Sequence, residues 1–249
     1  MRTILLWVIY PLWRPFYLVL LIVNTALLAT IVVCLSLFDR NGNLVHYVGR
    51  FWSLLNLYLA GTRVKLIGHQ NLENNRAYIV MSNHQSLFDV WALIGKLPLQ
   101  IRWIVKQELR RVPLFGYALE RMGHLYIDRK DPRGAYHRIE SRAGKLHQGT
   151  SFVIFPEGTR SPDGRLQKFR KGGAAMALAS GAPILPVTVN GGRFALPKGT
   201  LALMPGKIEI IISPPIDPAP FGPDRAGELM DHVKKAIAGN LDLTYGSLT

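Results

Sequence analysis

The sequence is poor in cysteine and in acidic residues, and both shortages restrict what the protein can be. Its single cysteine, Cys34, rules out an intrachain disulfide and a cysteine-rich metal site. Because Cys34 lies in an apolar run, we expect a small buried thiol there. Only 16 Asp and Glu stand against 30 Lys and Arg, which gives a formal net charge of +14. Such a charge favours an anionic partner: nucleic acid, an anionic membrane surface or a phosphorylated substrate.

The positive charge is concentrated between Arg102 and Lys171, where 16 basic and 7 acidic residues leave a net charge of +9. Many of these side chains are expected to form a solvated basic face, but the concentration also indicates one surface that meets anions. The stretch contains no recognisable nucleic-acid-binding motif, and the chain has no internal repeat and no low-complexity linker. We therefore expect no nucleic acid among the partners.

The longest stretch without a charge lies near the N-terminus, from Pro15 to Phe38, and covers 24 residues. A helix of about 20 apolar residues spans the hydrocarbon core of a bilayer. Aromatic residues crowd the N-terminal end of this stretch, as they do at membrane interfaces. A cleaved signal peptide is the alternative, but the apolar stretch is unusually long and no small-residue cleavage site follows it. We predict a membrane anchor.

A second apolar segment, Leu44–Ala60, is interrupted by His46 and Arg50. It is either the return arm of a helical hairpin or a helix that lies in the headgroup plane. The charges that flank the first segment are too balanced to orient it by the positive-inside rule. We expect a membrane-anchoring helical segment over residues 1–61 and an α/β domain over residues 62–249.

After Gly61 the hydrophobic pattern changes to short strands that alternate with helices. We expect strands at 63–67, 77–81, 101–105, 124–127, 151–155, 184–189 and 207–212, and helices at 87–95, 113–122, 133–148, 172–180 and 225–240. This alternation predicts an α/β fold with a single, largely parallel sheet and helices outside it. The continuous apolar run 151–155 (SFVIF) is typical of a buried central strand.

The first polar motif is Asn83–Asp89 (NHQSLFD), which follows an apolar strand and opens a helix. Ligand sites of parallel α/β sheets form in such loops. His84 could act there as a general base, because an unperturbed histidine has a pKa of about 6.5. Asp89 is five residues further on, about 140° around a regular helix, so the two side chains share no helical face. They can meet only if His84 lies in the turn before the helix. A loop histidine beside an Asp favoured by the helix dipole is the alternative.

A second polar loop, Phe155–Ser161 (FPEGTRS), directly follows the strand SFVIF. Pro156 ends the strand, and Gly158 permits a tight turn or a close backbone approach. Arg160 presents a planar fork that can hold a phosphate at two points. Glu157 could orient Arg160 or accept a substrate hydroxyl, whereas a surface ion pair in a turn is the alternative.

Two further segments follow other strands. Gly123–Arg129 (GHLYIDR) ends in Asp128-Arg129, so Arg129 is either a second anion contact or only the neighbour of Asp128. Ala182–Val187 (APILPV) is expected to shape the site without doing chemistry. The chain has no Gly-x-Ser-x-Gly nucleophile elbow and no His, Asp and Glu cluster with metal-ligand spacing. We therefore expect no metal and no cofactor.

In this order the four segments resemble the glycerolipid acyltransferase family, which includes the 1-acyl-glycerol-3-phosphate acyltransferases. NHQSLFD is similar to the first block of that family, GHLYIDR to the second, FPEGTRS to the third and APILPV to the fourth. The resemblance covers roughly Val64–Val189. The first and third blocks, about seventy residues apart, form a highly specific pair.

The resemblance implies an enzyme that moves a fatty acyl group from acyl-CoA or acyl carrier protein to the sn-2 hydroxyl of 1-acyl-sn-glycerol 3-phosphate (lysophosphatidic acid), giving phosphatidic acid. It implies that His84 is the general base and that Asp89 orients it. Substrate binding is implied for a further set of residues: Lys106, Arg129, Glu157, Gly158, Thr159 and Arg160.

The resemblance also implies that the enzyme works at a membrane bilayer. In a bacterium this would be the inner, cytoplasmic membrane, with the active site facing the cytoplasm. Two alternatives stay open. The acceptor could be glycerol 3-phosphate or another lipid, or the protein could be a noncatalytic module that binds anionic lipid.

Overall fold

The computed structural model describes residues 10–39, 41–128, 131, 134, 138, 141 and 149–247. The α-helices are α2 (Tyr10–Leu35), α3 (Asn43–Leu59), α4 (Leu87–Lys96), α5 (Phe115–Arg121), α7 (Gly172–Ser180), α8 (Gly192–Ala195) and α9 (Ala226–Ala238), and two 3₁₀ turns are η2 (His69–Asn71) and η3 (Gln107–Arg111). The strands are β1 (Arg63–Ile67), β2 (Ile79–Ser82), β3 (Gln100–Lys106), β4 (Leu125–Ile127), β5 (Thr150–Ile154), β6 (Ile184–Asn190) and β7 (Lys207–Ile212). The helix expected at 133–148 falls almost entirely outside these residues.

Within the described residues, the strands form one seven-stranded sheet in the order β1-β7-β6-β2-β5-β3-β4. The predicted α/β fold with a largely parallel sheet is confirmed, because every neighbouring pair is parallel except β6 and β7. The β1–β7 pair thus runs against the other five strands. Since β2, β5 and β3 are parallel neighbours, their carboxyl ends meet at one edge of the sheet, where polar loops follow β2 and β5.

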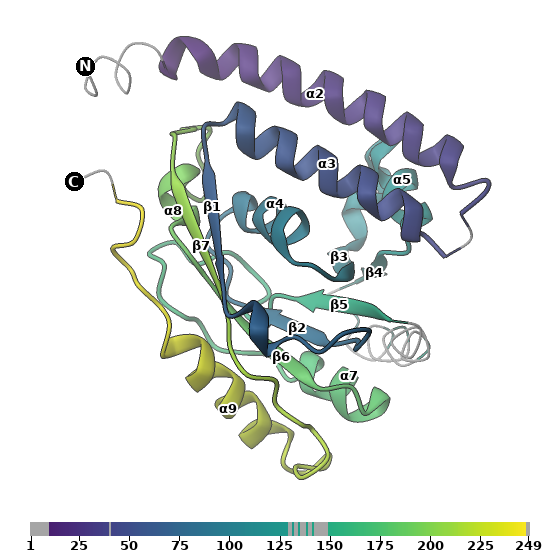
Figure 1. Ribbon diagram of the computed structural model, residues 1–249, viewed down its shortest axis with the longest axis vertical. Helices are drawn as coiled ribbons and strands as arrows, with labels where there is room; N and C mark the ends of the chain where they lie inside the picture. The colour runs from purple at the N-terminus through teal and green to yellow at the C-terminus, as the bar shows by residue number, and fades with distance from the viewer. Residues whose placement is uncertain are drawn as a thin grey trace.

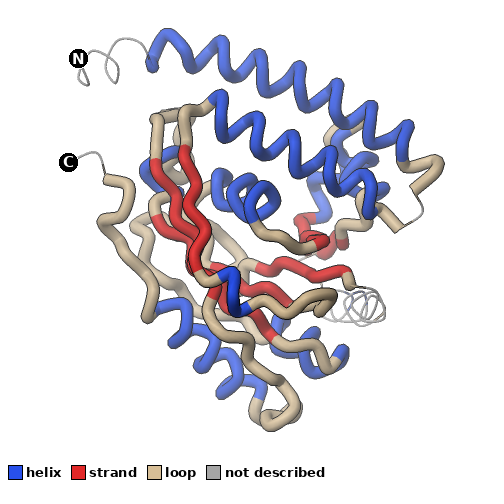
Figure 2. The backbone as a smooth tube through the Cα atoms, viewed as in Figure 1, coloured by secondary structure: helices blue, strands red, loops and turns tan. Residues whose placement is uncertain are grey.

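Helices cover both faces of the sheet (Figures 1 and 2). On one face α4 lies against the strands, α3 lies over α4, and α2 is outermost. On the other face α7 and α9 pack against the sheet. Two apolar cores correspond to these faces. One joins Tyr17 and Leu57 of the first helices to Phe88 and the strands, and the other joins Met176 and Val233 to the opposite side of the sheet. Burial of these side chains supplies the main driving force for folding.

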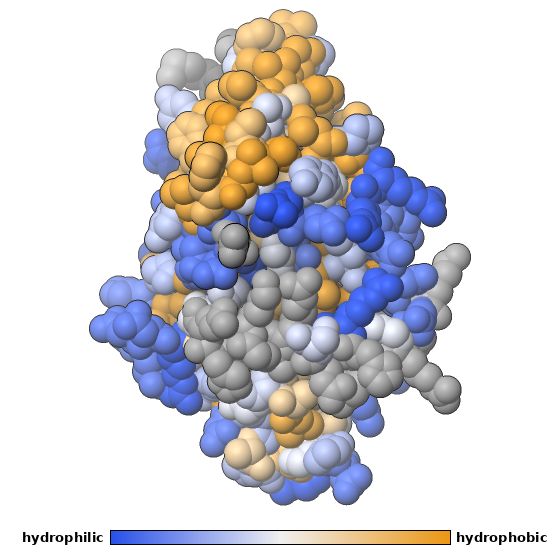
Figure 3. All heavy atoms as spheres, turned by 90° about the vertical axis from the view of Figure 1, so that its right-hand side faces the viewer, coloured by the Kyte–Doolittle hydropathy of each residue, from blue (hydrophilic) through white to orange (hydrophobic). Residues whose placement is uncertain are grey.

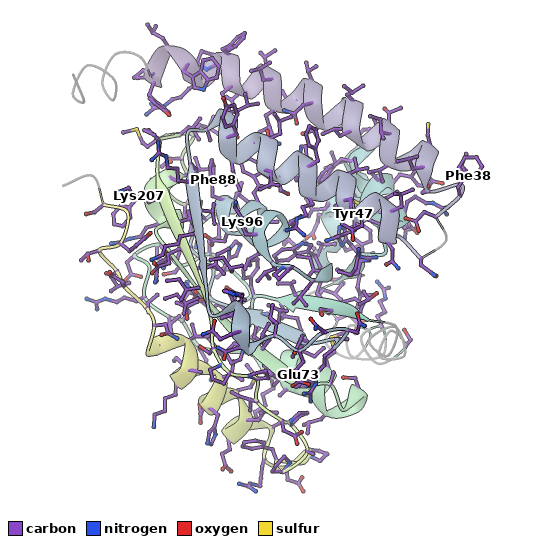
Figure 4. All side chains as sticks on the ribbon, in the orientation of Figure 1. Phe38, Tyr47, Glu73, Phe88, Lys96 and Lys207 are labelled. Carbon is purple, nitrogen blue, oxygen red and sulfur yellow. The ribbon has the colours of Figure 1, made fainter. Side chains whose placement is uncertain are left out.

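Helices α2 and α3 form a hairpin, which is one of the two arrangements that the sequence left open. Asp39 in the turn accepts hydrogen bonds from the backbone N–H groups of Asn43 (3.2 Å) and Val45 (2.9 Å) at the start of α3. Helix α2 is long and apolar enough to cross a membrane. Its outer surface exposes large apolar side chains, and Phe38 beyond its end points away from the protein (Figure 4). The expectation of a buried thiol at Cys34 is wrong, because the outward face of α2 exposes this side chain.

The hairpin also shares a core with the strands, because Tyr17, Leu57 and Ala60 belong to the same apolar cluster as Val80 of β2. Its turn is tied to the sheet by the buried side chain of Arg102, which lies on β3. The guanidinium of Arg102 donates to the backbone O of Asn41 (3.2 Å) and to Oδ1 of Asn43 (3.0 Å). The division at residue 61 stays a prediction.

Candidate active site

His84 and Asp89 lie together at the carboxyl end of β2. Nδ1 of His84 is 3.0 Å from Oδ2 of Asp89. The contact forms because His84 lies in the loop before α4 while Asp89 lies in the first turn of that helix, as the five-residue spacing required. An ionised carboxylate only accepts hydrogen bonds, so Nδ1 of the neutral imidazole carries the N–H proton. Nε2 then has a free lone pair that can accept a proton. The His84 side chain is 13% exposed and that of Asp89 is fully buried.

The local sequence explains how Asp89 is held. Ser86 caps α4, accepting a hydrogen bond from the backbone N–H of Phe88 with its side chain. Oδ2 of Asp89 in turn accepts the N–H groups of Gln85 (2.6 Å) and Ser86 (2.7 Å), besides the bond to His84. This reciprocal pattern is a capping box, with a carboxylate at the positive end of the helix. Oδ2 therefore has one fixed position, whereas the buried Oδ1 has no hydrogen-bond partner among the residues that the structure describes.

The FPEGTRS loop after β5 holds His84 from the neighbouring strand. Its Glu157 accepts the backbone N–H of His84 (3.0 Å), and its Ser161 donates its N–H to the carbonyl of His84 (2.7 Å). The rings of His84 and Phe155 are stacked, with centroids 3.8 Å apart and planes 5° apart. The first and third sequence blocks thus meet, and the imidazole is fixed by main-chain bonds and by an aromatic face.

Glu157 is buried, and both of its oxygens are engaged. Oε1 accepts the N–H of His84, and Oε2 accepts that of Gln167 (3.1 Å). Burial raises the pKa of Glu157, although these backbone hydrogen bonds oppose the shift. No described contact joins its carboxylate to the Arg160 side chain. The structure therefore gives Glu157 a positioning role between two loop segments, and substrate binding by it stays a prediction.

The remaining residues of the loop are more accessible. Gly158 has a φ of +72°, and a Cβ there would lie 2.9 Å from Nε of Arg170, so a larger residue would be strained and crowded. Thr159 is exposed and Arg160 is half-buried. The backbone carbonyl of Arg160 accepts a hydrogen bond from Nζ of Lys198 (2.6 Å). The guanidinium of Arg160 makes no hydrogen bond or ion pair within the described part of the chain. That charge is thus available for an anion.

The other two predicted binding residues are less informative. Lys106 ends β3 at the same edge of the sheet, exposed and paired with Glu108 at 3.3 Å. Arg129 lies outside the described residues. Among those residues no group of three or more His, Cys, Asp and Glu could hold a metal ion, and the expectation that no metal is used stays a prediction.

The turn after β6 encloses the pair from the other side, which sequence reasoning did not anticipate. The Asn83 side chain exchanges two hydrogen bonds with the main chain of Val189, at 2.7 and 2.8 Å. The hydroxyl of Ser86 donates to the carbonyl of Leu196 (2.8 Å). Gly192 lies so close that a Cβ on it would overlap Oδ1 of Asp89. The only signal in the sequence is the glycine pair after β6, and a glycine pair ordinarily indicates just a turn.

A histidine with one nitrogen on a buried carboxylate and the other free can remove a proton from a hydroxyl. The loop beside it carries the guanidinium of Arg160, which can bind a phosphate. Together with the α/β fold, this arrangement suits group transfer to an alcohol. The Acyltransferase family model matches residues 63–190, just over half of the chain, and the protein is an acyltransferase.

Known relatives agree with that match. A 1-acyl-sn-glycerol-3-phosphate acyltransferase of Pseudomonas aeruginosa is 35% identical over 181 residues, which are 72% of this chain and 69% of that protein. The chloroplastic enzyme BAT2 of Brassica napus is 31% identical over 210 residues, covering 83% of this chain and 59% of that protein. The crystal structure of the 1-acyl-sn-glycerophosphate acyltransferase PlsC of Thermotoga maritima superimposes with a TM-score of 0.80 at 27% identity, covering 95% of each chain. The chain belongs to the Acyltransferase family.

Proposed function

We propose that the protein transfers a fatty acyl group from an acyl-CoA or acyl carrier protein thioester to the sn-2 hydroxyl of 1-acyl-sn-glycerol 3-phosphate, giving phosphatidic acid. The observation that carries the proposal is the 3.0 Å contact between His84 Nδ1 and Asp89 Oδ2, which leaves Nε2 as a base. The acceptor follows from the relatives in bacteria and plants, which are named for acylation of 1-acyl-sn-glycerol 3-phosphate.

The reaction proceeds by direct transfer. Nε2 of His84 takes the proton of the acceptor hydroxyl while its oxygen attacks the thioester carbonyl carbon. Collapse of the tetrahedral intermediate breaks the carbon–sulfur bond, and the imidazolium returns its proton to the leaving thiolate. Asp89 keeps the tautomer that this cycle needs and stabilises the imidazolium, as the Asp of a hydrolase triad does.

Two features support a phosphorylated lipid as acceptor. Arg160 presents a guanidinium that no described residue pairs with, in the loop that also holds His84, and such a fork binds phosphate through charge-assisted hydrogen bonds. Helix α2 exposes large apolar side chains along its outer face, which fits a protein that stays at the bilayer where its lipid acceptor resides. In a bacterium, the proposed site is the cytoplasmic face of the inner membrane.

The test is an acyl-transfer assay of the full-length protein in vesicles, with lysophosphatidate or glycerol 3-phosphate as acceptor and each of the two thioesters as donor. His84→Ala should lower kcat by about 10²–10⁴-fold, the usual contribution of a general base. His69→Ala is the matched control, because His69 is an exposed histidine on η2, away from the site.

The outcomes separate the alternatives. Transfer only to glycerol 3-phosphate would reject the lysophosphatidate assignment while leaving acyl transfer intact. Binding to anionic vesicles without any transfer would favour a noncatalytic lipid-binding protein. The expected loss of about 10²-fold or more would leave about a hundredth of the wild-type kcat or less. If His84→Ala kept more than about a tenth of it, another group would have to be the base.

A further inference from the structure

The segment between β3 and α5 presents apolar side chains to the outside next to the hairpin. Residues 107–114 are all exposed, and the first turn of α5 adds Tyr117. Four large apolar side chains in residues 109–117, which we call the β3–α5 loop, are more than a third exposed: Leu109, Val112, Leu114 and Tyr117. Such a row on a surface loop needs an explanation, because contiguous exposed apolar groups mark interaction sites.

Leu114 is held in a backbone conformation that a leucine rarely adopts. Its φ is 60° and its ψ is −51°, and the N–H of Phe115 bonds the carbonyl of Pro113 at 2.6 Å across it. This is the rare, strained form of the γ-turn. Strained residues of this kind gather where function requires them. The turn keeps Leu114 39% exposed, whereas leucine side chains are usually buried.

The β3–α5 loop and helix α2 face each other across one groove of about 370 Å³. The groove is lined by Leu21, Ile22, Thr25, Ala26 and Ala29 of α2, by Trp52 and Trp91, and by residues 112–115. Ile22 on one bank is 68% exposed and Leu114 lies on the other. The exposed apolar surface of α2 therefore continues across the groove onto the β3–α5 loop. On the face shown in Figure 3, apolar side chains gather over the upper part, and hydrophilic side chains border them from below.

The charges beside the loop fit a lipid headgroup layer. Arg111 is exposed within it, and so is Arg110, which pairs with the exposed Glu120 at 3.1 Å. Arginine keeps its charge in the headgroup region while apolar neighbours enter the acyl boundary. An anionic leaflet also attracts a protein of net charge +14. A bilayer matches both the apolar row and the arginines next to it.

We propose that the β3–α5 loop is a second membrane contact, in which Leu109, Val112, Leu114 and Tyr117 enter the anionic leaflet on which α2 lies. The proposal rests on the proposed membrane-bound acyl transfer. It places the groove between loop and helix against the bilayer, so a lipid acceptor can approach from the leaflet without crossing water.

Site-specific fluorescence tests the contact without relying on activity. In a Cys34→Ser background of the full-length protein, Leu114→Cys carries an environment-sensitive fluorophore, and Lys235→Cys on the exposed face of α9 is the control. In vesicles of phosphatidylcholine and phosphatidylglycerol, acyl-chain spin labels should quench the probe at 114 several-fold more than the probe at 235, and aqueous iodide should do the reverse. Equal access of iodide to both probes would overturn the proposal.

A second variant separates membrane contact from folding. Leu114→Gly removes the side chain but suits the positive φ, so its Tm should not fall. Its acyl transfer should drop several-fold with lysophosphatidate in vesicles and stay unchanged with a short-chain acceptor dissolved in water. An equal drop with both acceptors would overturn the proposal, because Leu114 would then act within the site. If the wild type acylates neither acceptor, the proposed function fails, and the quenching experiment still decides on the contact.

Discussion

Gly192 should be the residue whose smallest enlargement damages the His84–Asp89 pair most. A methyl group at this position would overlap Oδ1 of Asp89 and lie 3.2 Å from both its Cγ and the Cβ of Ser86. The φ of Gly192 lies outside the left-handed region, so Gly192→Ala introduces a steric conflict and no backbone strain. Asp89 is fully buried, and therefore the carboxylate must rotate or the turn after β6 must retreat.

Either movement disturbs the hydrogen bonds that hold the Asp89 carboxylate. Oδ2 of Asp89 takes three hydrogen bonds of 2.6–3.0 Å, one of them from His84. Overpacking of a buried site costs about 1–3 kcal/mol of stability. Loss of an oriented base costs about 10²–10⁴-fold in rate. We expect Gly192→Ala to lower kcat by about 10²-fold or more and to leave KM for both substrates nearly unchanged, because the pair acts on the proton and holds neither substrate.

The assay is steady-state acyl transfer together with a melting curve, which shows that the variant is folded. Gly227→Ala on α9 is the control, because a Cβ there meets no atom closer than 3.8 Å. A double-mutant cycle decides the mechanism. If Gly192 acts through Asp89, Gly192→Ala should cost nothing further in an Asp89→Ala background. Unchanged kcat in the single variant, or an equal loss in both backgrounds, would refute the steric reasoning.

Three further predictions concern the acceptor, the hairpin turn and the buried arginine. Arg160→Ala should bring the ratio of kcat/KM for lysophosphatidate over monoacylglycerol toward one, and Arg160→Lys should recover part of it. Burial raises the pKa of Asp39, but hydrogen bonds from the backbone N–H groups at the start of α3 outweigh it and lower the pKa overall. Its stabilising contribution is therefore present above the unfolded pKa of about 3.9 and is lost as pH falls through the lower folded value. The difference in Tm between wild type and Asp39→Asn should shrink between pH about 5 and 3. Arg102→Met should cost about 2 kcal/mol, or about 4–8 °C in Tm, because the guanidinium bonds to Asn41 and Asn43 disappear.

The sequence predicted the elements around the site because their signals are local. Period-two and continuous apolar runs located each strand within about two residues. The spacing of His84 and Asp89 permitted contact in only one way, with the histidine before the helix, and the capping box supplies that geometry. The direction of β7 was beyond such reasoning, because the same alternation fits a parallel or an antiparallel neighbour.

Other features of the site depend on contacts between distant residues. Glu157 is polar and lies beside Arg160, so a local interpretation assigns it to substrate, yet its oxygens bond main-chain groups of His84, 73 residues away, and Gln167. Gly192 carries no side chain from which a role could be predicted. Leu114 has a positive φ that sequence reasoning reserves for glycine or asparagine. For Glu157 and Gly192 the decisive partner comes from another strand or loop.

The arrangement explains why blocks so far apart in the chain are needed for one histidine. His84 follows β2, whose neighbours β5 and β6 run parallel to it on either side. The loop after β5 supplies both main-chain bonds and the ring against which the imidazole stacks, and the turn after β6 confines the carboxylate that orients it. The parallel strands β2, β5 and β6 thus place the loops that follow them at one edge of the sheet. We therefore expect substitutions in the turn after β6 to act on kcat, and those in the β3–α5 loop to act on access of the lipid.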